Sequence, residues 1–314
     1  MRFAVYGTGA VGGYFGGRLA QAGEDVTFIA RGAQLEAIRR DGLHVSSIAG
    51  DFTVHPARAT DDPAAVGAVD VVLVGVKAWQ LVDVAKAMQP LIGSATVVLP
   101  LENGIEAPDE LARVIGRQHV LGGLCRIFAW VESPGHITHA GIDPQVAFGE
   151  LDGTRSARVE RLRSAFDGAH GVRAEVPDDI GVAMWSKFLF ITGWGGVGAL
   201  TRVPVGVLRR VPESRALLQR ALREICDVAG ARGVALPHDS AERVLAYIDG
   251  LPADGTTSMQ RDVAAGRPSE LEAQVGAIVR LADAAKVDVP LHRVIHAALL
   301  PLELTARGTL PAGA

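Results

Sequence analysis

A lysine inside an apolar segment is the first residue in this sequence that could do chemistry. Lys187 lies in the middle of GVAMWSKFLFITGWGGVGAL, the stretch from Gly181 to Leu200, whose first half has the composition of a buried helix. Burial lowers the pKa of a lysine ammonium, which makes it a better proton donor. Hydride reduction of a carbonyl leaves negative charge on the oxygen, and a positioned acid that protonates it contributes ~10²–10⁴-fold to the rate. Lys187 is therefore a candidate general acid; the alternative is a lysine that extends from the helix edge to solvent or forms a structural ion pair.

A glycine motif at the N-terminus predicts a nucleotide site. The apolar strand Arg2–Tyr6 leads directly into a GxGxxG pattern, and a second strand follows Gly23. The first glycine of this pattern permits a tight turn, the second lets the backbone approach a pyrophosphate, and the third lets the helix pack closely on the strand. The free N–H groups at the start of the helix then face the phosphates. The alternative is a glycine turn that serves packing alone. The residues expected to bind the dinucleotide are Gly7, Thr8, Gly9, Ala10, Val11 and Gly12.

The end of the second strand discriminates between cofactors. NAD enzymes usually place Asp or Glu there, where the carboxylate holds the ribose 2′-hydroxyl. This strand ends in Ala30-Arg31 instead. A cation at this position can hold a 2′-phosphate, so Arg31 favours NADP, and the alternative is a solvated loop arginine.

Two later strands deliver polar residues to the edge of the predicted sheet. The apolar run VDVVLVGVKAWQ is typical of a parallel strand covered on both faces, and Lys77 follows its end. The next strand, ATVVLPLENGIE, brings Asn103-Gly104 to the same edge. Ligands bind at the carboxyl ends of the strands in such sheets. An Asn-Gly pair after a strand is also a common turn, so this motif by itself leaves open whether Asn103 binds a ligand or only forms the turn.

The patterns divide the chain into two domains. Up to about residue 177 the segments are strands and single helices, including an expected hairpin around Ala49-Gly50 and a turn at residues 133–135. From Asp178 onward, apolar residues recur at three- and four-residue intervals, as in packed helices. We therefore predict an α/β protein with a Rossmann-type dinucleotide-binding domain at residues 1–177, followed by an all-helical domain at residues 178–314.

Composition excludes several classes of function. A net charge of −4 with 21% charged residues offers no electrostatic attraction to nucleic acid or to an anionic membrane. There is no run of about 18 uncharged apolar residues, so no membrane span is expected. The first strand begins at once, which leaves no room for a signal peptide. Cys125 and Cys226 stand apart and no metal-binding spacing is present, so we expect no metal and a reducing, cytoplasmic location.

Six ordered motifs along nearly the whole chain resemble the ketopantoate reductase family, the 2-dehydropantoate 2-reductases. Ser258-Met259, Asp262, Gly266-Arg267 and Glu270 recur in that family at this spacing, which makes the last motif the most specific. The motifs read GTGAVG, VKAWQ, ENG, MWSKF, RVPVGVLR and TSMQRDVAAGRPSELE. The resemblance implies NADPH-dependent reduction of a 2-oxo acid to a 2-hydroxy acid. The reaction of the family itself converts 2-dehydropantoate to pantoate in pantothenate biosynthesis.

The roles of the family's residues carry over by position. Lys187 matches the general-acid lysine, and Glu270 matches a glutamate near the nicotinamide ribose and the active centre, which helps to hold the substrate or the lysine. Asn103 matches an asparagine that meets both cofactor and substrate, and Ser258 a serine that contacts the substrate carboxylate. Arg31 and Lys77 match residues that face the adenosine 2′-phosphate. The expected partner is a small-molecule substrate, and apolar residues on the C-terminal helices are compatible with a homodimer.

Several positions depart from the pattern of the family. The enzymes that act on ketopantoate usually carry asparagines one and two turns after the lysine, where this chain has Ile191 and Gly195. A third polar contact is replaced by Val205, and a histidine common before the Asn-Gly pair is replaced by Glu102. A site built for hydroxyl groups loses much affinity when its polar partners are removed.

These departures leave three functions open. The first is the ketopantoate reaction itself. The second is a sister reductase for a bulkier or more apolar 2-oxo acid or carbonyl, in which the glycines after Lys187 open room and Trp194 forms an apolar wall. The third is a non-catalytic NADPH-binding sensor, which would not need both Lys187 and Glu270. The glycines themselves have a simpler alternative, because they could serve only the close packing of helices.

Overall fold

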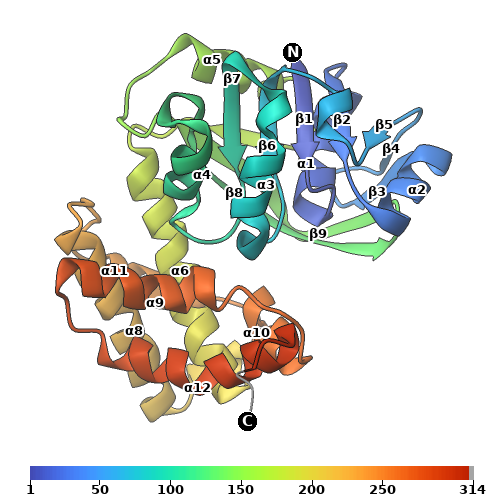
Figure 1. Cartoon of the computed structure of the whole chain (residues 1–314). Coiled ribbons are helices and arrows are strands. Elements are labelled where there is room, and N and C mark those ends of the chain that lie inside the picture. Colours follow the sequence, from blue (N-terminus) through green and yellow to red (C-terminus); the bar gives the residue numbers. More distant parts are fainter. Residues whose placement is uncertain (311–314) are drawn as a thin grey trace. The chain divides into compact units, whose positions relative to one another are not determined.

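The computed structural model describes residues 1–310 and divides into two compact units (Figure 1). The first unit comprises Met1–Glu102 and Ala107–Gly181, and the second comprises Asn103–Glu106 and the chain from Val182 onward. The first is built on a parallel sheet and the second is helical, so the predicted fold class is confirmed.

The first unit contains a five-stranded parallel sheet in the order β5-β2-β1-β6-β7. Alternate residues of its strands face two different cores. Phe3 and Val5 of β1 pack with Tyr14 and Phe15 of α1, whereas Ala4 lies in the core formed with helices α3 and α4. This two-sided burial explains why the central strands are continuous apolar runs. The strands are β1 (Arg2–Tyr6), β2 (Asp25–Ile29), β5 (Arg58–Thr60), β6 (Val69–Val74) and β7 (Ile92–Pro100).

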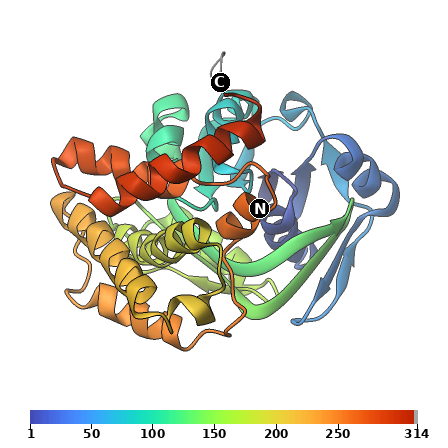
Figure 2. The same ribbon diagram turned by 90° about the horizontal axis from the view of Figure 1, so that it is seen from below.

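A second sheet completes this unit. Strand β9 pairs with β8 antiparallel and with β3 and β10 parallel, and β3 pairs with β4 in the antiparallel hairpin that the sequence predicted. Figure 2 shows β8 and β9 (green) as long strands running together. His136 Nε2 is hydrogen-bonded to the Ser46 hydroxyl at 2.9 Å, and His139 Nδ1 to the Ser47 hydroxyl at 2.8 Å. Both histidines therefore link β9 to β3 within the sheet. The strands are β3 (Leu43–Ser47), β4 (Phe52–Val54), β8 (Gly122–Ser133), β9 (His136–Gly149) and β10 (Arg173–Glu175).

Five helices and four short 3₁₀ turns belong to the N-terminal part of the chain. The helices are α1 (Ala10–Gln21), α2 (Gly32–Asp41), α3 (Leu81–Ala87), α4 (Ala107–Ile115) and α5 (Ala157–Asp167), and the turns are η1 (Pro63–Ala65), η2 (Ala78–Gln80), η3 (Gln89–Leu91) and η4 (Arg117–His119).

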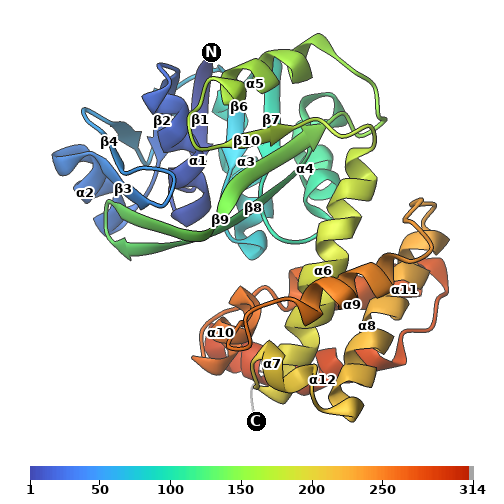
Figure 3. The same ribbon diagram turned by 180° about the vertical axis from the view of Figure 1, so that it is seen from behind.

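The second unit is organised around α6 (Ile180–Thr201), against which its other helices pack (Figure 3). This helix is long and apolar enough to cross a membrane by length and composition alone. Most of its residues are nevertheless buried in the protein, where Phe188, Leu189 and Val197 share one core with Leu222 and Ile225 of α8. The other elements are α7 (Val205–Leu208), α8 (Pro212–Ala231), α9 (Ser240–Asp249), α10 (Ser258–Ala264), the π-helical turn η5 (Glu272–Gly276), α11 (Ala277–Ala285) and α12 (Pro290–Arg307).

The glycines of α6 serve close packing. The helix is continuous through all of them, and a Cβ atom at Gly193 would lie 2.5 Å from Leu222 Cδ2. At Gly196 it would lie 3.2 Å from Val275 Cγ2, and at Gly198 it would lie 2.7 Å from Gln260 Oε1. Neighbouring side chains therefore occupy the space beside these glycines, and the expectation that they open a larger pocket is wrong at these three positions.

Gly193→Ala is predicted to destabilise the protein although alanine favours a helix. Alanine gains about 1 kcal/mol of helix propensity over glycine, but overpacking a core costs about 1–3 kcal/mol. Gly230 of α8 is the matched control, because an added Cβ there meets no atom within 4 Å in the described part of the chain. Gly230→Ala should raise the urea midpoint and Gly193→Ala should lower it. Equal stabilisation by both substitutions would contradict close packing at Gly193.

Candidate active site

The turn between β1 and α1 has the geometry that the glycine spacing requires. Gly7 has a φ of +92°, and a Cβ at Gly12 would lie 2.2 Å from the Gly7 carbonyl oxygen, so neither position tolerates a side chain. A Cβ at Gly9 would meet no atom of the described residues within 4 Å. The helix begins at Ala10, directly after this open glycine. The start of α1 therefore presents backbone N–H groups next to an open space.

Gln34 holds this turn in place, a role that the sequence did not indicate. Its amide nitrogen donates to the Thr8 carbonyl oxygen at 2.8 Å, while its amide oxygen accepts from the Gly135 N–H at 2.9 Å. Thr8 is itself buried, and its hydroxyl donates to the Ile29 carbonyl oxygen at 3.2 Å. The turn is thus tied to both sheets of the unit.

Two cations lie at the same edge of the parallel sheet as this turn. Strands β2 and β6 flank β1 in parallel, so their carboxyl ends lie beside the β1–α1 turn. Arg31 follows β2 as the residue before α2, and Lys77 follows β6. Both are exposed, and the Lys77 ammonium lies 5.7 Å from the ring centre of Trp79. Together with the positive end of the α1 dipole, this edge favours an anionic ligand.

In the second unit, Asn103 and Glu270 are brought together. The Asn103 amide donates to Glu270 Oε2 at 2.9 Å, across 167 positions of sequence. The carboxylate is only 6% exposed. Gly104 makes the approach possible, because its φ is +129° and a Cβ there would lie 3.1 Å from the Ala273 carbonyl oxygen. The Asn-Gly pair is therefore more than a simple turn, since it docks the segment Asn103–Glu106 onto η5.

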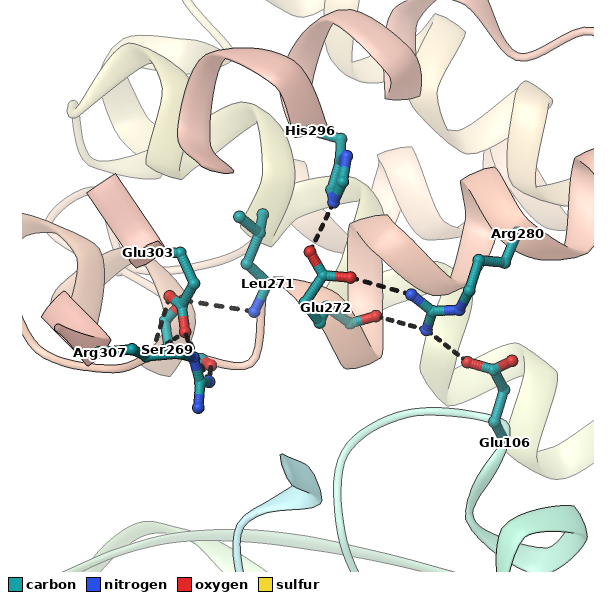
Figure 4. Close-up of polar contacts among 8 residues, drawn as sticks. All are labelled: Glu106, Ser269, Leu271, Glu272, Arg280, His296, Glu303 and Arg307. Carbon is teal, nitrogen blue, oxygen red and sulfur yellow. Dashed lines mark hydrogen bonds and ion pairs between the residues drawn. The ribbon is translucent and has the colours of Figure 1, made fainter. Parts of the chain in front are cut away.

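The residue before Glu270 is fixed by a buried carboxylate (Figure 4). Glu303 of α12 is 2% exposed and accepts from both the N–H and the hydroxyl of Ser269, the latter at 2.5 Å. Arg307 donates to Glu303 at 2.6 Å and to the Ser269 carbonyl oxygen at 2.9 Å. These bonds fix the backbone from which the Glu270 side chain extends.

On the other side of Glu270, Arg280 links three groups (Figure 4). It donates to Glu106 Oε2 at 2.6 Å, to Glu272 Oε2 at 2.9 Å and to the Glu272 carbonyl oxygen at 2.8 Å. His296 completes the cluster at 2.7 Å from Glu272 Oε1, and this hydrogen bond holds the pKa of the Glu272 carboxyl below its usual value despite burial. Because Glu106 belongs to the segment that carries Asn103, Arg280 anchors that segment to η5.

The other residues that the sequence singled out lie on α6, on α10 and in the helical core. Lys187, half-buried, shares one face of α6 with Ile191 and Gly195 at four-residue spacing. Ser258 is exposed as the first residue of α10. Val205 is fully buried in the helical core. Sequence reasoning missed Gln274, Arg280 and Glu303. Gln274 contacts Glu270 from the next helical turn, Arg280 bonds to Glu106 and Glu272, and Glu303 bonds to Ser269.

Comparison with known proteins identifies relatives along almost the whole chain. Residues 3–153 match the family described as ketopantoate reductase PanE/ApbA, and residues 179–303 match its C-terminal part. The chain is 31% identical over 301 residues to the uncharacterized oxidoreductase YkpB of Bacillus subtilis, covering 95% of this chain and 98% of that protein. It is 31% identical over 302 residues to the 2-dehydropantoate 2-reductase of Mesorhizobium japonicum, covering 90% of this chain and 91% of that protein. The crystal structure of a PanE/ApbA family ketopantoate reductase from Ralstonia eutropha superposes with a TM-score of 0.89 at 32% identity, covering 98% of this chain and 100% of that one.

Arg280→Gln is predicted to loosen the segment Asn103–Glu106 without unfolding the protein. The substitution removes the bonds to Glu106 and Glu272, and a net hydrogen bond is worth about 0.5–1.5 kcal/mol. Amide hydrogen exchange in residues 103–106 should then speed up by about tenfold, while the melting temperature changes little because half-exposed ion pairs contribute about 0–1 kcal/mol. Arg293→Gln, which removes a similar arginine paired with Asp283, is the control and should leave this segment unchanged. Unaltered exchange in Arg280→Gln would show that the segment is held by other contacts.

Proposed function

This chain belongs to the ketopantoate reductase family, and from that premise we propose that it reduces 2-dehydropantoate to pantoate with NADPH. It is an oxidoreductase that acts on a CH–OH group, converting a 2-oxo acid to a 2-hydroxy acid. The observation that carries the proposal is the buried Glu270 carboxylate held by Asn103. A protein that only binds the dinucleotide would not need both Glu270 and Lys187.

The N-terminal unit fits a dinucleotide with a 2′-phosphate. The open position at Gly9 leaves space for a pyrophosphate against the backbone. We propose that residues Gly7, Thr8, Gly9, Ala10, Val11 and Gly12 hold this group through the start of α1. Arg31 and Lys77 supply the two cations for a 2′-phosphate, which favours NADPH over NADH. Bound NADPH would supply the hydride for the reaction.

The second unit supplies the acid and the substrate contacts. We propose that Lys187 donates a proton from its ammonium to the carbonyl oxygen as negative charge develops there. Ser258 contacts the substrate carboxylate. Glu270 holds the substrate or Lys187 in position, and Asn103 meets both cofactor and substrate. In this account the dinucleotide-binding domain spans residues 1–177 and the catalytic helical domain residues 178–314, in a cytoplasmic enzyme that can form a homodimer.

The alternative of a bulkier or more apolar substrate has no support in the packing of the helical unit. Met259, Gln274 and Thr257 lie 3.2 to 3.4 Å from the position of a Cβ at Gly195. The fully buried Val205 belongs to the core. The replaced polar residues therefore leave no enlarged apolar space at these positions.

Lys187→Ala is predicted to abolish most turnover while NADPH binding persists. Loss of the general acid should lower kcat by about 100-fold or more. Turnover is measured by NADPH absorbance with 2-dehydropantoate, and binding by NADPH fluorescence. If NADPH binding disappears together with activity, Lys187 has a structural role and the assignment as acid is wrong.

Arg31→Asp is predicted to shift the cofactor preference toward NADH. A carboxylate repels the 2′-phosphate and can accept from a ribose 2′-hydroxyl. The ratio of kcat/KM for NADPH to that for NADH should fall by at least about tenfold, since a hydrogen bond to a charged group is worth about 1.5–3 kcal/mol. Arg161→Asp, on the exposed face of α5, makes the same charge change elsewhere in the unit and should leave the ratio unaltered. A constant ratio in Arg31→Asp would rule out this contact.

A further inference from the structure

Gln274 presents a buried amide oxygen that none of the described residues satisfies. Its side chain is 2% exposed, and within residues 1–310 its Oε1 atom has no hydrogen-bond partner. Its Nε2 atom donates to Glu270 Oε2 at 3.5 Å. Because a carboxylate oxygen can only accept, this contact fixes the orientation of the amide and turns the carbonyl oxygen away from Glu270. Buried polar groups almost always have partners, so this acceptor requires an explanation.

The free oxygen points toward Gly195 of α6. A Cβ at Gly195 would lie 3.4 Å from Gln274 Oε1, 3.4 Å from Thr257 Oγ1 and 3.2 Å from Met259 Cε. Two side-chain oxygens thus approach one glycine in the helix. We call the surroundings of Gly195, formed by Thr257, Met259 and Gln274, the Gly195 recess.

The chemistry of the recess suits a hydroxyl group. Gln274 Oε1 can accept a hydrogen bond, and the Thr257 oxygen already accepts from the Gln260 N–H, which leaves its hydroxyl hydrogen free to donate. A group that both donates and accepts would satisfy both residues. The methyl end of Met259 borders the recess, and its unbranched thioether chain can rotate to admit a ligand.

The recess lies on the face of α6 that carries Lys187. Residues 187, 191 and 195 recur at four-residue intervals, and Lys187 and Gly195 are about 12 Å apart along the helix axis at a rise of 1.5 Å per residue. A substrate held on this face by the ammonium therefore lies on the same side of α6 as the recess.

We propose that Gln274 is a specificity-determining residue that accepts a hydrogen bond from the hydroxyl group of a 2-oxo acid substrate, with Thr257 as the complementary donor. The inference rests on the proposed function and assigns the polar contact that the replaced asparagines no longer supply. It also explains why glycine occupies position 195, since any side chain there would approach the Gln274 oxygen and the Met259 methyl.

The test compares two acids that differ by a single hydroxyl group. 2-Dehydropantoate and 3,3-dimethyl-2-oxobutanoate share the carboxylate, the carbonyl and both methyl groups, and only the first carries the hydroxyl. The wild-type protein should show a higher kcat/KM for the hydroxylated acid. Gln274→Leu should lower this ratio by about tenfold through loss of one hydrogen bond. Loss of the contact with Glu270 lowers kcat/KM for both acids alike and cancels in the ratio.

Gln260→Leu provides the matched control. Gln260 is also a buried glutamine whose Oε1 has no hydrogen-bond partner between Met1 and Leu310, but it lies beside Gly198 rather than Gly195. Its substitution should leave the ratio for the two acids as in the wild type. Gln274→Met, which keeps the length of the side chain without the oxygen, should repeat the result of Gln274→Leu.

The outcomes separate this inference from the proposed function. Equal loss of activity on both acids in Gln274→Leu would overturn the specificity role and show that Gln274 acts on Glu270. If the wild-type protein shows about the same kcat/KM for both acids, the inference is overturned. This measurement needs no variant, so the test holds even if the variants do not fold. Absence of turnover with both acids would overturn the proposed function itself, and the inference with it.

Discussion

The close approach of other helices to the glycine-rich half of α6 is the contact on which the helical unit depends. At Gly193 and Gly198 the nearest side-chain atoms lie closer to the position of a Cβ than a methyl group allows. Leucine from α8 and valine from η5 fill the grooves where side chains would otherwise stand. Each glycine in a helix interior costs about 0.5–1 kcal/mol in backbone entropy, and dense packing of apolar residues against α6 offsets this cost.

The same packing places the elements of the site. Because η5 packs against α6 at Gly196, the residues just before and within this turn, Glu270 and Gln274, lie beside the helix that carries Lys187. A π-helical turn shifts the register of a helix, and such turns occur often at functional sites. Two polar clusters then fix the backbone on either side of Glu270, one through Glu303 and one through Arg280. A buried carboxylate is costly unless it is paired or hydrogen-bonded, and Asn103 and Gln274 each donate a hydrogen bond to Glu270.

Much of this organisation could be read from the sequence, because it depends on local patterns. Apolar runs predicted the parallel strands, glycine spacing predicted the β1–α1 turn, and the ends of β2 and β6 placed Arg31 and Lys77 at one edge. The short hairpin of β3 and β4 was predicted correctly for the same reason.

The rest depends on contacts between segments that are distant along the chain. Nothing near Glu106 indicates that it pairs with Arg280 across 174 positions, or that Asn103–Glu106 belongs to the helical unit. The sequence also could not decide what the glycines of α6 do. A glycine can leave open space in a pocket or let a neighbouring helix approach closely, and the residue is the same in both cases. Only the positions of Leu222, Val275 and Gln260 decide between them. The replacements at Ile191, Gly195 and Val205 suggested that the site had lost its polar side chains. The amide of Gln274, however, reaches the Gly195 recess from η5.

The most direct test is product analysis with NADPH that carries deuterium at both C4 positions of the nicotinamide. The purified protein is incubated with this cofactor and 2-dehydropantoate, and the product is examined by mass spectrometry and NMR. We expect pantoate that carries a single deuterium at C2, because the hydride adds to the carbonyl carbon while the proton on oxygen comes from an acid and not from the cofactor. If the protein binds NADPH but forms no deuterated pantoate, the assignment of this reaction to the chain is contradicted.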